Sequence, residues 1–324
     1  MALPLRVVTY YIGCQELDPT INSHQRIFQA KEMAVLAPVI SQLKRKAFEE
    51  KEGAVAARLA AIADVILIQM ASQTDWLRRP FFHVLEEHKF NLFACKTPSP
   101  ETAIAVRKDL GRPIEAKMLN TNIKSFFDGC KQATYLNMHV NGLPIPLVLI
   151  SLNFQWIGLS PASKIRSKLD WDDQKRQNGV AYINRVLSDI SKNALTLVGG
   201  NFNADPHNAH ELFDALEDKN FTQVPNRSFT HYSNTGLAEF YLTSDYLFFH
   251  MGPSTPYLCR TGEAVVPPDF AVERAPEGKF YTPDTYIKQT SLSHHTPVQA
   301  IFQVVPKSKE EPKEDLLGFN SLSI

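Results

Sequence analysis

Residues Val198–Pro206 read VGGNFNADP. The apolar run Ala194–Val198 precedes the two glycines and predicts a strand that ends there. Asn201 and Asn203 are two residues apart, so on an extended backbone both side chains point the same way. Open α/β folds build their sites at such strand ends. The stretch predicts two amides in one cavity, although a turn in which Asn and Asp satisfy backbone groups also explains it.

Strand and helix patterns alternate along the rest of the chain. Helical spacing occupies residues 23–62, about 74–88, 171–191 and 209–217, and Pro38 and Gly53 divide the first of these stretches. Asn141-Gly142 between two apolar runs predicts a hairpin. The further predicted strands are Leu5–Tyr11, Ala63–Met70, Asn91–Lys96, Thr102–Arg107, Ala133–Val140, Pro146–Phe154, Phe240–Phe249 and Pro297–Val304. Hairpins and helix-flanked strands occur in both halves, which predicts two mixed sheets packed face to face with helices outside.

The composition is typical of a globular protein, with 44% hydrophobic and 21% charged residues in a chain of 324. One large domain is expected over residues 1–305. The segment 306–324 begins with PKSKEEPKED, whose charge and prolines predict a flexible tail.

Charge and cysteine content limit the functional classes. The 34 basic and 34 acidic side chains balance, whereas nucleic-acid binders usually carry a basic excess, so there is no strong nucleic-acid signal. The four cysteines show no CxxC spacing, which favours reduced thiols and no zinc site. No apolar run is long enough for a transmembrane segment, and the first residues lack the features of a secretory signal. A cytoplasmic protein is expected.

Gly200–Ala204, GNFNA, resembles the GDFNA signature of the endonuclease/exonuclease/phosphatase superfamily. Further stretches that resemble landmarks of this family are LRVVTYYI (5–12), DVILIQM (64–70), TAIAVR (102–107), LISLNF (149–154), SDYLFF (244–249) and SHHTPV (293–298), all in the family's order. Together these landmarks extend over nearly the whole chain. The resemblance implies a deoxyribonuclease-like, four-layer α/β/β/α sandwich of two mixed sheets. It also implies phosphate-ester hydrolysis by water with the help of Mg²⁺, a hard cation that needs carboxylate oxygens.

The resemblance implies that five functional positions are substituted here. Met70 stands at the principal metal-binding Glu, and His294 at an Asp that often binds metal. Asn201 replaces the Asp that orients or deprotonates water. Tyr11 and Asn153 stand at the positions of an Asn and a His. A thioether is a poor Mg²⁺ ligand and an amide offers no base, so no metal and no other cofactor are expected.

Three family positions are retained, namely Asn203, Asp245 and His295. In the family, the matching Asp and His form a pair near the scissile phosphate, so the resemblance implies that Asp245 orients His295. This remnant is expected to bind a phosphate-like anion.

Two functions follow from these substitutions. One is a degenerate family member, a pseudoenzyme that acts as a binding or effector module for a phosphate-containing ligand or a protein partner. The alternative is an active, divalent-metal-dependent phosphoesterase with altered ligands: a nuclease, a phosphodiesterase or a phosphoinositide phosphatase that uses Mg²⁺. A relocated metal site at Asp205, His207, His210 and His294 would serve it, although a turn and helix cap also explain Asp205.

The tail gives one further hypothesis. Glu310, Glu311 and Glu314 precede Leu316-Leu317 and the final apolar residues. This order resembles the acidic-then-apolar C-terminal signals of bacterial type IV secreted effectors, so export through a C-terminal signal is a hypothesis beside cytoplasmic residence.

Overall fold

The computed structural model describes residues 4–12, 46, 49–69, 79–94, 102–120, 132–154, 177–187, 191–202, 206, 210–234, 239–270 and 295–307. Within these ranges, no helix combines the length and apolar character that a membrane crossing requires. Cys259, the cysteine that falls within them, is a free thiol, and burial raises its pKa to about 12.

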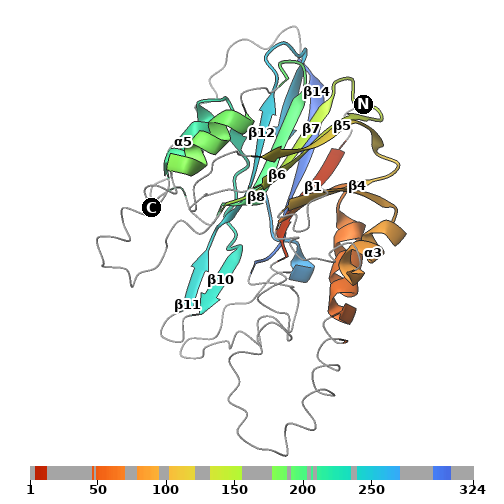
Figure 1. The fold of residues 1–324 in the computed structure, drawn as a ribbon. Coiled ribbons are helices and arrows are strands. Elements are labelled where there is room, and N and C mark those ends of the chain that lie inside the picture. Colours follow the sequence, from red (N-terminus) through yellow and green to blue (C-terminus); the bar gives the residue numbers. More distant parts are fainter. Residues whose placement is uncertain are drawn as a thin grey trace, which may run out of the picture.

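The described strands form two six-stranded mixed sheets and a separate two-stranded ribbon (Figure 1). The first sheet has the order β13 (Tyr257–Thr261), β14 (Val298–Pro306), β1 (Pro4–Tyr11), β2 (Val65–Gln69), β4 (Thr102–Arg107) and β3 (Phe90–Ala94). The second has the order β5 (Gly111–Asn120), β6 (Gln132–Val140), β7 (Leu147–Asn153), β8 (Leu195–Asn201), β12 (Asp245–Met251) and β9 (Thr222–Gln223). The ribbon pairs β10 (His231–Asn234) with β11 (Glu239–Leu242). Each large sheet contains one parallel pair, β1–β2 or β7–β8, among antiparallel neighbours.

Three apolar clusters show how the layers stack. The side chains of successive strand residues point to opposite faces, so Val7 joins the cluster between the sheets while Val8 joins the outer one. The outer face of the first sheet packs against the helix at 49–62 and α3 (Pro80–Glu87). The outer face of the second sheet packs against the helix at 177–186 and α5 (His210–Glu217). A 3-10 turn at Pro268–Phe270 also covers the first sheet. The predicted four-layer sandwich is therefore confirmed.

Several local predictions are confirmed, and two need correction. Asn141-Gly142 turns the chain between β6 and β7, with Gly142 at a φ of 78° that favours glycine. The prediction of one continuous strand over 240–249 is wrong, because Thr243 and Ser244 separate β11 from β12. The strand predicted to end at Val198 instead continues to Asn201. Predictions for residues 23–45 and 74–78 lie outside the described residues.

Four strands, β5, β9, β10 and β13, were not predicted. Of these, β5, β9 and β13 lie at the edges of the large sheets, and β10 belongs to the two-stranded ribbon. The residues of β5 are largely exposed and include Pro113, so the strand lacks the apolar run or alternation that marks a buried strand. Exposed edges are the parts of a sheet that hydrophobic patterns detect least.

Gly199 allows the two sheets to approach closely. A Cβ built on Gly199 would lie 2.6 Å from Leu67 Cδ1 of the opposite sheet and 2.8 Å from Leu247 Cδ2. Both values are shorter than a normal contact, so an added methyl group would force the side chains or the sheets apart.

We expect Gly199→Ala to destabilise the fold by about 1–3 kcal/mol, the usual cost of overpacking a core. Gly262→Ala is the control, because a Cβ there would meet nothing within 4 Å. Chemical denaturation of both variants gives the free energies of unfolding. Equal stability of the two variants would contradict close sheet packing at Gly199.

Arg6 and Asp64 join the start of β1 to the residue before β2. The guanidinium Nη2 lies 2.7 Å from Asp64 Oδ1, and Arg6 Nε and its backbone N–H both donate to Oδ2. Burial by itself raises the pKa of the Asp64 carboxyl, but the hydrogen bonds and charge of Arg6 outweigh it and hold that pKa below its ordinary value. The pair thus stabilises the folded state while Asp64 is ionised.

We expect Asp64→Asn to lower stability at pH 7 by about 1–2 kcal/mol, toward the lower end for a hydrogen bond to a charged group, because the Arg6 side chain is partly exposed. Because the folded pKa is depressed, this stabilisation is complete above the unfolded pKa, near about 4, and is lost as the pH falls through the folded value. The difference between wild type and variant should therefore shrink in acid. Asp109→Asn is the control, since the exposed pair with Arg107 should contribute less than about 1 kcal/mol. A difference that stays constant down to acid pH would refute the assignment.

Candidate functional site

The layer between the sheets is apolar along most of its length and polar at one end. On the inward face of β2, Val65 and Leu67 are followed by Gln69. On β7, Leu147 and Leu149 are followed by Ser151 and Asn153. The corresponding polar residues on β1 and β8 are Thr9 and Asn201. These four strands form the two parallel pairs, so the polar end, as we call it, lies at their carboxyl ends.

Gln69 joins the two sheets at this end. Its amide nitrogen donates to Ser151 Oγ at 3.1 Å in the opposite sheet and to Leu67 O at 2.9 Å. Its amide oxygen accepts from Thr9 Oγ1 at 3.2 Å, and Ser151 Oγ donates to Ile68 O at 2.9 Å. A fully buried amide is retained without penalty only when its groups are paired. Gln69 thus fixes the relative position of the strands that form the site.

Three polar residues lie side by side across the ends of β7, β8 and β12. Asn153 is the register partner of Asn201, and Asn201 is the register partner of Asp245. Register partners point to the same face, here toward the first sheet. All three side chains are buried. Among the described residues, Asn153 Oδ1 and Asp245 Oδ1 have no hydrogen-bond partner, so two buried acceptors face this region.

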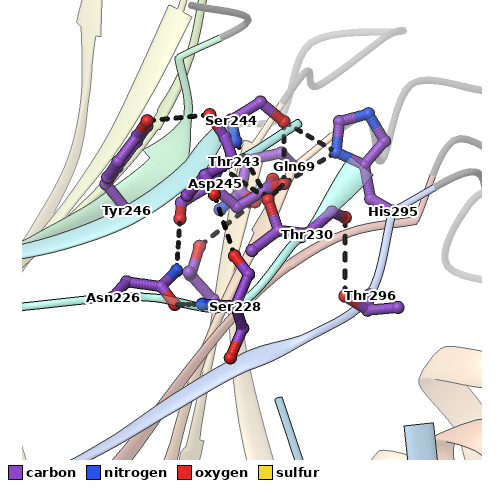
Figure 2. A network of polar contacts seen from close by, with 11 residues as sticks. Gln69, Asn226, Ser228, Thr230, Thr243, Ser244, Asp245, Tyr246, His295 and Thr296 are labelled. Carbon is purple, nitrogen blue, oxygen red and sulfur yellow. Dashed lines mark hydrogen bonds and ion pairs between the residues drawn. The ribbon is translucent and has the colours of Figure 1, made fainter. Parts of the chain in front are cut away.

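Asp245 and His295 form a buried pair (Figure 2). His295 Nδ1 lies 2.8 Å from Asp245 Oδ2, which also accepts from Thr230 Oγ1 at 2.8 Å and Ser244 Oγ at 3.0 Å. An ionised carboxylate only accepts, so Nδ1 carries the proton in this contact. The second ring nitrogen, Nε2, points away from Asp245 in Figure 2.

Tyr11 covers one side of this pair. Its ring centroid lies 4.2 Å from that of His295, with the ring planes inclined at 38°. An aromatic ring at this distance restricts the orientation of the imidazole. The family resemblance expects an Asn at this position, and an Asn has no ring that could make this contact.

The structure brings together five of the eight residues selected from the sequence: Tyr11, Asn153, Asn201, Asp245 and His295. Met70, Asn203 and His294 lie outside the described residues, as do Asp205 and His207. His210 begins α5, where its side chain is exposed next to Glu211.

Sequence reasoning did not identify Gln69, Ser151, Thr230 or Ser244 as parts of the site. Ser244 could have been noticed because it precedes Asp245 directly. Thr230 has no local signal, since it lies 15 residues before Asp245 in the chain and belongs to no landmark.

The described residues of the polar end offer Mg²⁺ one carboxylate, that of Asp245, beside neutral amides. Mg²⁺ prefers oxygen ligands and is usually held by one or two carboxylates together with waters and substrate phosphates. Among the described residues, no group of three His, Cys, Asp or Glu side chains gathers in a way that could hold a metal ion. Asp245 Oδ2 already accepts from three donors, whereas Asp245 Oδ1 and Asn153 Oδ1 have no hydrogen-bond partner among the described residues, and Asn153 and Asn201 are neutral amides.

The same sandwich is found in solved structures of distant sequences. An endonuclease/exonuclease/phosphatase from Bacteroides vulgatus superposes with a TM-score of 0.58 at 11% identity, over 94% of this chain and 100% of that chain. A functionally unknown protein from Enterococcus faecalis V583 gives 0.56 at 14% identity, over 94% and 100%. D. rerio TDP2, in complex with a single-strand DNA product, gives 0.55 at 11%, over 92% and 98%.

No protein-family model matches the sequence, and no curated protein matches it significantly. At such low identities the structural likeness establishes the fold alone. The fold is that of the endonuclease/exonuclease/phosphatase proteins, as the sequence landmarks predicted.

A double-mutant cycle tests the link between the sheets. Gln69→Leu should cost about 1–3 kcal/mol, because it leaves buried hydroxyl groups without their partner. Ser151→Ala in the same chain removes one of those partners, so the two changes together should cost less than their sum by about 0.5 kcal/mol or more. Denaturation of the two single variants and the double variant measures the coupling. Strictly additive losses would show that Gln69 does not bridge the sheets.

Proposed function

We propose that this protein is a pseudoenzyme of the endonuclease/exonuclease/phosphatase fold that binds a phosphate-containing ligand at the polar end without hydrolysing it. One observation carries the proposal. Asn201 lies in register beside Asp245, at the position where the family resemblance expects the water-orienting Asp, and Asp245 is itself engaged by three donors.

The loss of hydrolysis follows from the chemistry of these groups. Attack by water needs a base to take its proton, and the Asn201 amide has no basic site at neutral pH. A single well-placed catalytic group contributes about 10²–10⁴-fold to a rate. With Met70 at the position of the principal metal-binding Glu, both the base and the metal ligand are replaced. We therefore assign no cofactor to the site.

Donors for an anion remain at the polar end, beside the acceptors Asn153 Oδ1 and Asp245 Oδ1, which are unpaired among the described residues and which a protonated phosphate oxygen would have to satisfy. The amide groups of Asn153 and Asn201 are neutral donors, and an imidazolium at His295 has a second N–H at Nε2. A phosphate oxygen accepts hydrogen bonds from all of these groups. Asp245 supports the imidazolium through the 2.8 Å contact at Nδ1.

Single-stranded DNA is one phosphate-containing ligand that deserves a direct test. The balanced charge of the chain gives no nucleic-acid signal of its own. However, D. rerio TDP2 has this fold and was solved with a single-strand DNA product. An oligonucleotide and inorganic phosphate are therefore the two probes for the ligand. The other partner that we propose for a binding module is a protein.

The alternative function is an active phosphoesterase with altered metal ligands. The retained Asp245–His295 contact favours it, because this pair is what the resemblance places next to a scissile phosphate. It requires Mg²⁺ ligands beyond the described residues.

We also propose that the protein resides in the cytoplasm and is exported through the tail. The proposal of export rests on the acidic-then-apolar sequence after Pro306. Deletion of residues 307–324 should abolish export in a bacterial secretion assay while leaving expression unchanged, and unchanged export of the truncated chain would remove the idea.

Phosphate binding and hydrolysis can be measured on the same samples. Wild type should bind inorganic phosphate or a short single-stranded oligonucleotide in EDTA, as measured by calorimetry, and should not cleave bis(4-nitrophenyl) phosphate with Mg²⁺ or Mn²⁺. His295→Ala should weaken binding about tenfold or more, the effect of losing a charge-assisted hydrogen bond.

His139→Ala is the matched control, because His139 is exposed on β6 and should leave binding unchanged. Metal-dependent cleavage by wild type that disappears in His295→Ala would overturn the pseudoenzyme assignment. Binding that is equal in both variants would remove the polar end as the ligand site.

A further inference from the structure

Thr230 lies at the centre of the contacts around Asp245, although it belongs to no landmark of the sequence. It is fully buried and directly precedes β10. Its hydroxyl donates to Asp245 Oδ2 at 2.8 Å and accepts from the backbone N–H groups of Ser244 at 3.0 Å and Asp245 at 3.1 Å. One side chain thus holds both the carboxylate and the backbone of Asp245.

The backbone of Thr230 reaches the other member of the pair. Its carbonyl oxygen accepts from the N–H of Thr296 at 2.8 Å and from Thr296 Oγ1 at 3.4 Å. Thr296 directly follows His295, so this contact fixes the backbone from which the imidazole projects (Figure 2). Asp245 and His295 are 50 residues apart, and Thr230 contacts the immediate surroundings of both.

These contacts lie at the break between β11 and β12. The N–H groups of Ser244 and Asp245 donate to the Thr230 hydroxyl at the base of the β10–β11 ribbon. Figure 1 shows this ribbon extending beyond the two large sheets. Thr230 Oγ1 therefore binds both the backbone at the base of the ribbon and the carboxylate of the Asp245–His295 pair.

We propose that Thr230 is a positioning residue that sets the orientation of the Asp245 carboxylate and, through it, the Nδ1–H tautomer of His295. The tautomer of an imidazole follows from the acceptor that its nitrogen finds. Without the Thr230 hydroxyl, the carboxylate loses one of its three donors and its backbone loses an acceptor, so the carboxylate could rotate and present its other oxygen to a different group. The β-branched side chain of Thr230 has few rotamers, so its hydroxyl stays directed at Oδ2. This role is independent of whether the site binds phosphate or hydrolyses it.

Two substitutions separate the hydroxyl of Thr230 from its packing. Thr230→Val keeps the shape and removes the hydroxyl, whereas Thr230→Ser keeps the hydroxyl and removes a methyl group. Thr243→Val is the matched control, because the Thr243 hydroxyl donates to Ser228 O at the same ribbon base without a contact to Asp245. Asp245→Asn is the reference variant, because in it His295 no longer faces a carboxylate.

The readout is the ¹⁵N NMR spectrum of the imidazole nitrogens, with the His295 signals assigned by their loss in His295→Ala and followed through a pH series. Wild type, Thr230→Ser and Thr243→Val should show the Nδ1–H tautomer of neutral His295. Thr230→Val should shift toward the mixture seen in Asp245→Asn.

The proposal would be overturned if the His295 signals of Thr230→Val were the same as those of wild type. It would also be overturned if Thr243→Val lost the wild-type His295 signals. Should Thr230→Val not fold, Thr230→Ala gives the same comparison, since it also lacks the hydroxyl. Loss of the tautomer in Thr230→Ser would likewise contradict the proposal, because packing rather than the hydroxyl would then hold the pair.

Discussion

The buried carboxylate of Asp245 is the constraint on which the site depends. An ionised carboxylate removed from water is stable only when donors surround it. Here Thr230, Ser244 and His295 supply those donors to a single oxygen, and each comes from a different part of the local structure. Thr230, which donates to this carboxylate, also accepts from the backbone at the break between β11 and β12 and from the N–H of Thr296, the residue after His295. The surrounding sheets supply a rigid frame, since Gln69 links them next to the same end.

The chemical character of the site is set by what accompanies this carboxylate. Its register neighbours Asn201 and Asn153 are neutral, and Tyr11 covers His295 with an aromatic ring. A site of amides and one imidazole recognises an anion through hydrogen bonds. A site that activates water needs more negative charge, to hold a hard cation and to accept a proton. We therefore propose recognition rather than hydrolysis, even though the fold is one that hosts phosphoesterases.

The central strands could be predicted from the sequence because burial on both faces makes them apolar runs. The segments that became β2, β7 and β8 are of this kind. The proximity of Asp245 and His295 was also foreseen, since both belong to short landmark stretches. Gln69 and Thr230 could not be assigned roles, because their partners lie on other strands and leave no local pattern. The strand β5 was not predicted for a different reason, because an exposed edge imposes no apolar alternation on its residues.

Calorimetric titration of Mg²⁺ into the protein in the presence of saturating inorganic phosphate tests most directly whether the polar end works without a metal. We predict no saturable Mg²⁺ binding and a phosphate affinity that is the same in Mg²⁺ and in EDTA. Stoichiometric Mg²⁺ binding that is lost in Asp245→Asn, together with phosphate binding that requires the metal, would contradict the account and restore the active phosphoesterase.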